Sequence, residues 1–175
     1  MAFDLMISTD RLVITEFTEG MAESVHLNSL DEDNRNFVPD EVFETVQEAE
    51  ETIRFLMDCY QGTEGPFVYP VLLKSGENIG HVQAVPYGDG WEVGYHIAAK
   101  YTGNGYATEA VRAFLPIIMK LLDMKQIWGV CRRDNVASCR VLEKCAFKLV
   151  SCEVANYHGR EHEVCKYIYS VEVES

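Results

Sequence analysis

The sequence predicts an α/β or α+β domain built on one central sheet. Three observations carry this prediction: strand patterns and helix patterns alternate along the chain, its 175 residues suit one domain of ordinary size, and apolar residues make up 47% of them. That apolar share is enough to bury a sizeable core. We therefore expect residues 1–175 to form a single domain.

The first part of the chain begins with a strand and continues with helices. Residues 11–17 (RLVITEF) alternate and are rich in β-branched side chains, which favours a strand. Residues 21–30 have the pattern of a short helix, and the polar stretch 31–40 is expected to be a loop. Residues 45–60 carry apolar side chains at helical spacing behind a capping box, so we expect a helix there.

The pattern in the middle of the chain predicts several strands in succession. Short alternating or apolar segments predict strands over residues 67–73, 79–85 and 91–97. Polar and glycine-containing turns at 75–78 and 88–90 separate them. These strands are expected to lie near the centre of the sheet.

The last part of the chain mixes helices and strands. Residues 106–122 predict one long helix, in which Pro116 removes a backbone donor and is expected to cause a kink rather than a break. The remaining patterns predict a helix over 136–144 and strands over 127–131, 147–154 and 164–173.

The net charge and the cysteine content disfavour several classes of partner. The net charge of −13 disfavours nucleic acid as a partner, because phosphates would be repelled, and leaves room for a cationic substrate. No run approaches the roughly 18 apolar residues of a membrane helix, and residues 1–10 lack a signal-peptide pattern, so we expect no membrane contact and a cytoplasmic location. The six cysteines have no zinc spacing; we expect no metal and interpret them as reduced core residues.

A glycine turn in residues 91–110 offers the first chemical signal. A strand runs into a short loop with two glycines, and a helix follows. The N–H groups of a helix N-terminus are unpaired, and Gly103 and Gly105 let a ligand approach the backbone, so a pyrophosphate suits this turn. An ordinary structural turn has the same pattern. Thr108 stands where the dinucleotide fingerprint needs a third glycine, which disfavours an NAD-binding oxidoreductase.

The sequence around this turn resembles a known family. Residues 100–105 resemble the pyrophosphate motif Arg/Gln-x-x-Gly-x-Gly/Ala of the GNAT superfamily of N-acetyltransferases. Residues 105–110 (GYATEA), 92–97 (EVGYHI) and 9–12 (TDRL) are similar to its RimJ/RimL branch, which acetylates the N-termini of ribosomal proteins. The blocks NVAS and VLEK, followed by Phe147, match the same branch. The order of these blocks fits over essentially the full chain.

Two positions depart from the family pattern. Lys100 stands where Arg or Gln is usual, and it keeps a cation near the expected phosphates. Ala146 replaces the usual glycine before Phe147. If that position requires a left-handed backbone, alanine costs roughly 1 kcal/mol there.

The resemblance implies the GNAT fold: a single mixed, mostly antiparallel sheet flanked by helices, in which the central strands 91–97 and 127–131 splay apart. It also implies acetyl-CoA as co-substrate, with the pantetheine arm lying in the gap and pairing with the backbone of the first of these strands. The cofactor-binding residues that it implies are Tyr95, His96, Ile97, Lys100, Gly103, Asn104, Gly105, Tyr106, Ala107, Thr108, Asn135 and Ser138.

The implied reaction is direct attack of a neutral amine on a thioester, which needs a base because a free alkyl amine is mostly charged at neutral pH. We choose Glu92, acting through water, because strand alternation puts it on the same face as Gly94 and His96. An ordinary edge carboxylate is the competing interpretation. His96 is a second candidate base or a packing histidine. A backbone N–H near Ile97 is the expected oxyanion donor.

The leaving thiolate needs a hydrogen-bond donor. Many family members use a tyrosine at the position of Leu142, so that role is vacant here, and the resemblance assigns it to Ser138. Asn135 either contacts the pantetheine amide or caps the helix that follows. Tyr157 and His158 fall in a polar loop that borders the acceptor site or is simply solvated.

The leading hypothesis is an N-acetyltransferase that moves acetyl from acetyl-CoA to a primary amine through a ternary complex. The acceptor is a protein N-terminus or a small amine, and the acidic composition favours a cationic one. The alternative is an acyl-CoA-sensing module without turnover, which the vacant tyrosine position keeps open. The sequence does not distinguish a monomer from a homodimer.

Overall fold

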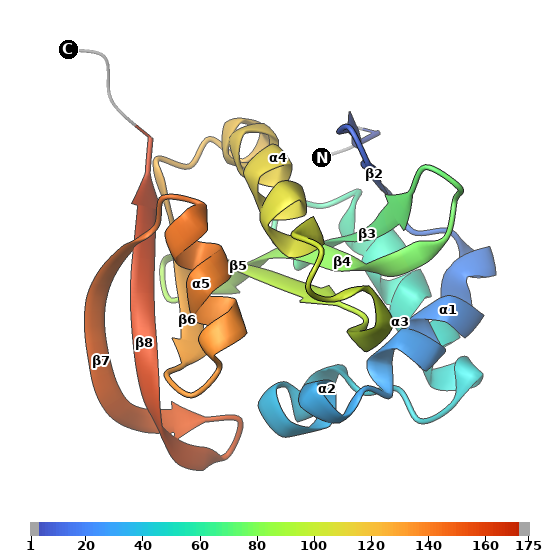
Figure 1. Ribbon diagram of the computed structural model, residues 1–175. Helices are drawn as coiled ribbons and strands as arrows, with labels where there is room; N and C mark the ends of the chain where they lie inside the picture. Colours follow the sequence, from blue (N-terminus) through green and yellow to red (C-terminus); the bar gives the residue numbers. More distant parts are fainter. Residues whose placement is uncertain (1–3, 172–175) are drawn as a thin grey trace.

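The computed structural model describes residues 4–171, and an open sheet of eight strands forms its centre (Figure 1). Across the sheet the strands run β1-β2-β3-β4-β5-β6-β8-β7. The pair β5–β6 is parallel and the other neighbours are antiparallel, which confirms the predicted mixed, mostly antiparallel sheet. The strands are β1 (Met6–Ser8), β2 (Leu12–Thr15), β3 (Phe67–Leu73), β4 (Asn78–Tyr87), β5 (Gly90–Ile97), β6 (Gln126–Arg132), β7 (Lys148–Tyr157) and β8 (Arg160–Ser170).

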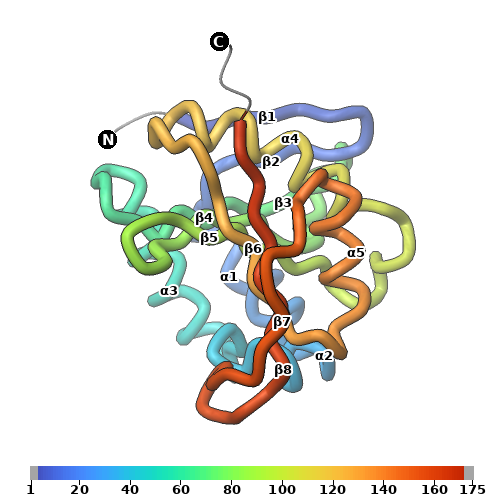
Figure 2. The backbone as a smooth tube through the Cα atoms, turned by 90° about the vertical axis from the view of Figure 1, so that its left-hand side faces the viewer, coloured from blue at the N-terminus to red at the C-terminus, as the bar shows by residue number. Residues whose placement is uncertain are grey.

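Helices cover both faces of the sheet (Figures 1 and 2). The α-helices are α1 (Ala22–Ser29), α2 (Glu32–Phe37), α3 (Val46–Cys59), α4 (Tyr106–Leu121) and α5 (Val136–Lys144). Within residues 4–171 there are also three short 3-10 helices. Of these, η1 (Glu19–Met21) joins β2 to α1, η2 (Pro39–Glu41) joins α2 to α3, and η3 (Ala99–Tyr101) joins β5 to α4. As predicted, α4 continues as one helix through Pro116.

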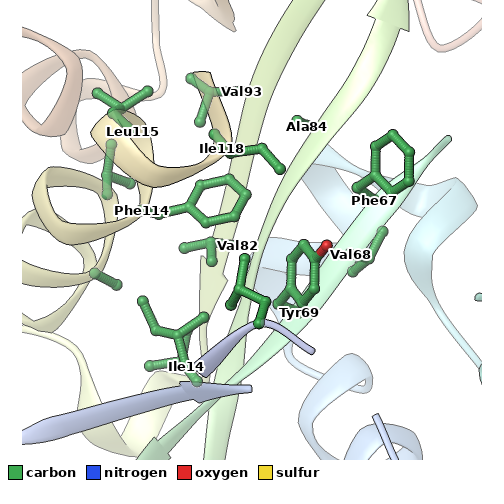
Figure 3. Close-up of a cluster of buried hydrophobic side chains, with 14 of the residues drawn as sticks. Ile14, Phe67, Val68, Tyr69, Val82, Ala84, Val93, Phe114, Leu115 and Ile118 are labelled. Atoms are coloured by element: carbon green, nitrogen blue, oxygen red, sulfur yellow. The ribbon is translucent and has the colours of Figure 1, made fainter. Parts of the chain in front are cut away.

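The face of the sheet under α4 holds the main core. Phe114, Leu115 and Ile118 of α4 point onto Val82 of β4 and Val93 of β5 (Figure 3). The three helix residues recur three and four positions apart and are at most 2% exposed, so they form one apolar stripe. Each such side chain contributes roughly 1.5–3 kcal/mol by leaving water. This packing fixes the N-terminus of α4 relative to the central strands.

The prediction of a loop over residues 31–40 is wrong, because most of this stretch forms α2 and η2. The buried side chain of Asn34 holds the segment together. Its Nδ2 donates to the backbone carbonyls of Ser29 at 3.0 Å and Glu41 at 3.2 Å. Both carbonyls lie within seven positions of Asn34, and hydrogen bonds from a side chain to nearby backbone leave no apolar periodicity in the sequence.

Both ends of the sheet also differ from the prediction. No sequence pattern predicts β1, a strand of three residues whose Met6 is 75% exposed. At the other end, β7 and β8 extend into the expected polar loop and are joined by His158 and Gly159 alone. These two residues have φ of 51° and 86°, as a two-residue hairpin turn requires. The predicted end of the last strand at Val173 lies outside the described residues.

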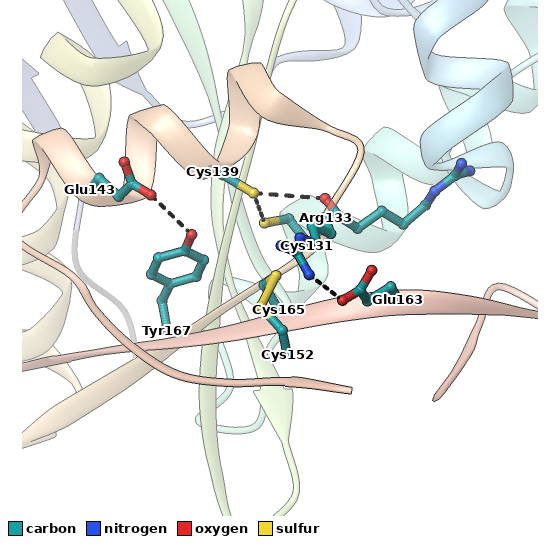
Figure 4. The surroundings of a disulfide bond; sticks show 9 residues. Cys131, Arg133, Cys139, Glu143, Cys152, Glu163, Cys165 and Tyr167 are labelled. Carbon is teal, nitrogen blue, oxygen red and sulfur yellow. Dashed lines mark hydrogen bonds and ion pairs between the residues drawn. A yellow bond between two sulfur atoms is a disulfide. The ribbon is translucent and has the colours of Figure 1, made fainter. Parts of the chain in front are cut away.

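The structure also corrects the prediction that all six cysteines are reduced (Figure 4). Cys152 and Cys165, opposite each other on β7 and β8, form a disulfide with a Cα–Cα distance of 4.2 Å, so they are not reduced. The sulfurs of Cys131 and Cys139 lie 3.0 Å apart as free thiols. The cysteines therefore do not support the cytoplasmic default, which stays a prediction.

Among residues 4–171, no helix has the length and apolar character of a membrane span, and no group of three or more His, Cys, Asp or Glu side chains is arranged to hold a metal ion. Ala146 between α5 and β7 has φ of 67°. The position is thus left-handed, and alanine carries the cost of about 1 kcal/mol that glycine would avoid.

Candidate active site

Strands β5 and β6 separate in the middle of the sheet (Figure 1). They pair only at Glu92 with Trp128 and at Val93 with Gly129. From Gly94 onward, β5 keeps β4 as its partner on one side and has no paired strand on the other within residues 4–171. The splayed central strands are confirmed, and one edge of β5 is free to bind an extended ligand.

A cavity of about 670 Å³ lies at this opening. Its walls come from β4, β5, β6, α2, α5 and the β7–β8 hairpin. The predicted site residues that line it are Glu92, Tyr95, His96, Ile97, Ala107, Asn135, Ser138, Tyr157 and His158. The structure thus brings together residues that are up to 66 positions apart, the separation of Glu92 and His158.

The glycine turn lies next to this cavity, where Thr102 and Ala107 line its wall. Gly103 and Gly105 have φ of 81° and 79°, and Gly105 is the N-terminal flanking residue of α4. A Cβ added at Gly103 would have no atom within 4 Å, so the backbone conformation is what calls for glycine. The remaining predicted residues of this segment, Lys100, Asn104, Tyr106 and Thr108, are outside the cavity lining.

Two cations near the turn are already engaged with groups of the protein. The Lys100 ammonium lies 3.4 Å from a carboxylate oxygen of Glu77 and its side chain is 69% exposed. The guanidinium of Arg11 instead lies over the Tyr106 ring, 4.4 Å from its centre, beside Gly105. Nε of Arg11 pairs with a carboxylate oxygen of Glu109 at 2.7 Å, and the sequence interpretation did not anticipate this cation because only the fold brings it to the start of α4.

Helix α5 points its N-terminal turn at the cavity. Asn135 caps the helix, since its Oδ1 accepts a hydrogen bond from the backbone N–H of Ser138 at 3.3 Å. The hydroxyl of Tyr95 donates to the backbone carbonyl of Ser138 at 2.8 Å and lies 2.9 Å from its Oγ. Burial raises the pKa of Tyr95, so this hydroxyl stays protonated. Leu142 is buried against Gly129 and contributes no hydroxyl.

Glu92 is the carboxyl best suited to act as a base in this cavity. Strands β4 and β5 pair His81 with His96, Gln83 with Gly94 and Val85 with Glu92, so these side chains share one face, as alternation predicts. Burial raises the pKa of Glu92 to about 7, with a further contribution from the nearby Glu41 carboxylate. A carboxyl with that pKa accepts protons efficiently near neutral pH.

Glu41, His81 and Gln83 are residues of this face that the sequence interpretation missed. Nε2 of Gln83 donates to Glu41 at 3.3 Å, and Nε2 of His81 lies 3.7 Å from the same carboxylate. Burial raises the pKa of Glu41 and lowers that of His81 to about 4, so the imidazole is neutral. The turn at 88–90 was the available signal, because it places His81 and Gln83 opposite the predicted strand. No sequence signal indicated Glu41, which directly follows the stretch 31–40 expected to be a loop.

His96 is less available as a base than Glu92. Its Nε2 lies 3.2 Å from the backbone carbonyl of Asn28 and 3.6 Å from a carboxylate oxygen of Asp31. Burial and the neighbouring His81 lower the pKa of His96. Nε2 therefore carries the hydrogen that is donated to the Asn28 carbonyl, and the lowered pKa keeps the ring neutral, which favours a positioning role.

The β7–β8 hairpin closes one end of the cavity. Nδ1 of His158 lies 2.8 Å from a carboxylate oxygen of Asp40, and the Tyr157 ring meets the His158 ring edge-on at 4.5 Å. Burial raises the pKa of Tyr157 to about 12. Both side chains line the cavity, as the resemblance implies for residues beside an acceptor.

Comparisons with known proteins agree with this geometry. Residues 11–148 match the model of a family described as an acetyltransferase (GNAT) domain. The N-acetyltransferase YnaD of Bacillus subtilis is 29% identical over 141 residues, which is 79% of each chain. An acetyltransferase of the GNAT family from Bacillus anthracis superposes with a TM-score of 0.80 at 24% identity, covering 95% of this chain and 98% of that one. The ribosomal protein acetyltransferase RimL, solved in complex with coenzyme A, gives 0.83 at 19% identity and the same coverage.

Proposed function

The chain belongs to the GNAT family of acetyltransferases, and from that membership we propose that it transfers the acetyl group of acetyl-CoA directly to a primary amine. The observation that carries the proposal is the Glu92 carboxyl. It lies in the cavity at the opening between β5 and β6, with a pKa of about 7. A carboxyl so placed suits proton removal from an amine beside the cofactor gap.

The free edge of β5 supports acetyl-CoA as the co-substrate. Tyr95, His96 and Ile97 offer backbone groups to the pantetheine arm along this edge. The left-handed Gly103 and Gly105 and the N–H groups of the first turn of α4 offer a site for the pyrophosphate. The similar RimL was solved with coenzyme A, which agrees with this assignment.

Glu92 removes one proton from the incoming ammonium, through a water molecule. The neutral nitrogen then attacks the thioester carbonyl, and a C–N bond forms. A backbone N–H near Ile97 stabilises the oxyanion. The C–S bond breaks, the nitrogen loses its second proton, and the sulfur leaves as the protonated thiol of CoA. Glu92 finally releases its proton to water, so each turnover yields one amide, one thiol and one proton.

Ser138 supports the departure of the sulfur. Its hydroxyl lies on the cavity wall beside the Tyr95 hydroxyl, and rotation of the serine side chain allows it to donate to a thiolate. Asn135 holds the first turn of α5 in place through its cap. Together they take the role that many relatives give to the tyrosine absent at Leu142.

Acetyl transfer is tested by incubating the protein with acetyl-CoA and a panel of amines that includes a peptide N-terminus, a polyamine and simple alkyl amines. We expect one amine class to gain the mass of an acetyl group while CoA thiol is released in equal amount. Tight acetyl-CoA binding with no acetylated amine in the whole panel would instead identify a sensing module. Binding of a nicotinamide dinucleotide but not of CoA would favour an oxidoreductase.

A further inference from the structure

A second cavity of about 370 Å³ adjoins the one at the β5–β6 opening. Asn34, Glu41, Gln83, Val85 and His96 line both cavities. The second one extends from the face that carries Glu92 toward α1 and α3. These five residues form the boundary between the two cavities, so the second space lies directly beside the cavity that holds Glu92.

The wall of the second cavity is largely apolar. Its apolar side chains include Phe17, Val25, Phe43, Ile53, Leu56 and Val68, and polar side chains line the rest of the wall. Phe55 of α3 also lines this cavity, and 56% of its surface is exposed. A concave apolar surface of this kind favours an apolar ligand, because burial removes apolar area of both partners from water.

Polar groups lie where the two cavities meet. Among the side chains of residues 4–171, Oδ1 of Asn34 is the one buried nitrogen or oxygen atom without a hydrogen-bond partner. The Nδ2 of the same amide is already used by the carbonyls of Ser29 and Glu41, so the oxygen remains as an acceptor. A buried acceptor of this kind is costly, and an N–H donor on a ligand would satisfy it.

We infer that the acceptor is a small primary amine with an apolar body, about the size of an aromatic ring on a two-carbon chain; this rests on the proposed function. Its nitrogen binds between Asn34 Oδ1 and the carboxyls of Glu41 and Glu92. Its body lies in the apolar cavity. A cavity of about 150 Å³ holds one benzene ring, so this one has room for a ring and a short chain.

The same wall disfavours the other acceptor classes. A polyamine would bring a second cation among apolar side chains, where its desolvation is poorly compensated. The Asp40 carboxylate lies at this cavity, but it already pairs with His158 at 2.8 Å. A peptide N-terminus would bring backbone N–H and C=O groups against the same wall, and these would lose their hydrogen bonds to water.

The substrate test compares 2-phenylethylamine with ethylamine, spermidine and a peptide that begins with serine. Each buried methylene is worth about fourfold in affinity, so we expect kcat/KM for 2-phenylethylamine to exceed that for ethylamine at least about tenfold. Equal values for these two amines, or a preference for spermidine or the peptide, would overturn the inference.

Two variants on α3 test the location. Thr52 lines the second cavity, so Thr52→Trp fills it and is expected to raise KM for 2-phenylethylamine about tenfold while KM values for ethylamine and acetyl-CoA stay unchanged. Glu51→Trp is the matched control, because Glu51 is exposed and outside the cavity lining. Phe55→Ser, at a half-exposed position, should fold normally and lower kcat/KM for 2-phenylethylamine alone. Equal kinetics in all three variants would contradict the inference.

A calorimetric titration tests amine binding in the second cavity independently of acetyl transfer. If no amine in the panel is acetylated, acetyl transfer fails, and titration of 2-phenylethylamine in the presence of CoA still tests the cavity. Binding that Thr52→Trp weakens and Glu51→Trp leaves intact supports the inference. Absence of binding overturns it, whatever the transfer assay gives.

Discussion

The hydroxyl of Tyr95 on β5 meets both the backbone carbonyl and the hydroxyl of Ser138 on α5, at 2.8 and 2.9 Å. This contact joins the free edge of β5 to the helix across the opening between β5 and β6. It also places the Ser138 hydroxyl on the cavity wall, which is where the leaving sulfur is proposed to lie. Tyr95, whose pKa burial raises, remains a fixed donor to the serine carbonyl.

Ser138→Ala tests the role of this hydroxyl. A hydrogen bond to a developing charge contributes about 1.5–3 kcal/mol, so we expect kcat to fall about tenfold to a hundredfold. KM for acetyl-CoA should change by less than about threefold, because the bond strengthens as the thiolate forms. Steady-state kinetics check this, and an unchanged kcat would remove Ser138 from the mechanism.

A matched pair of glycine substitutions tests the phosphate turn. Gly103 and Gly88 both have positive φ, of 81° and 60°, and both have open space around an added Cβ. Each alanine variant should lose about 1 kcal/mol of stability. Only Gly103→Ala should also weaken CoA binding, by about tenfold or more, as measured by calorimetry. Equal CoA affinities in the two variants would place the pyrophosphate elsewhere.

Glu92→Gln tests the base. Because the carboxyl must be ionised to accept a proton and its pKa is about 7, we expect wild-type kcat/KM to rise with pH up to about 7 and then level off from this group. In the variant, kcat/KM should be about a hundredfold to a thousandfold lower, and its rise with pH up to about 7 should be absent. Glu64→Gln, at an exposed carboxyl outside the cavity, is the control. A full rising limb in Glu92→Gln would assign the base to another group.

The same substitution has a consequence for stability. The pKa of Glu92 rises from its ordinary value of 4.5 to about 7 on folding, so the folded state binds more protons between these values. Stability therefore falls as pH rises through this window, and the loss is complete above about pH 7. Glu92→Gln should be more stable than wild type at pH 8 by about 1–2 kcal/mol and equal to it near pH 4. Urea unfolding at both pH values measures this; lower stability of the variant at pH 8 would show that the carboxylate is stabilising.

The central strands and the longer helices were predictable because they carry regular periodicity. Helix α5 was predicted with its bounds, since Asn135 caps it and apolar residues follow at helical spacing. The strand β3 was likewise predicted from an apolar run between turns. The short segment of α2 and η2 was not, because Asn34 holds it through hydrogen bonds to nearby backbone carbonyls, and such bonds leave no apolar periodicity.

The residues of the site also divide into those that the sequence predicted and those that only the fold brings together. Glu92 and His96 were predictable as residues of one strand face, and Ser138 by resemblance. His81 and Gln83 reach that face through pairing of β4 with β5, which requires knowing the register. Glu41 reaches it from η2, and the acidic partner that helps to raise the pKa of Glu92 was therefore missing from the sequence interpretation.

The central claim is that acetyl passes directly from acetyl-CoA to an amine held beside Glu92. A single-turnover reaction with enzyme in excess over acetyl-CoA tests it most directly, with intact-protein and product masses followed over time. We predict that acetyl-amine and CoA thiol appear at one common rate, only when the amine is present, while the protein mass stays unchanged. Acetyl groups that accumulate on the protein before the amine reacts, or bound acetyl-CoA that never acetylates an amine, would contradict the claim.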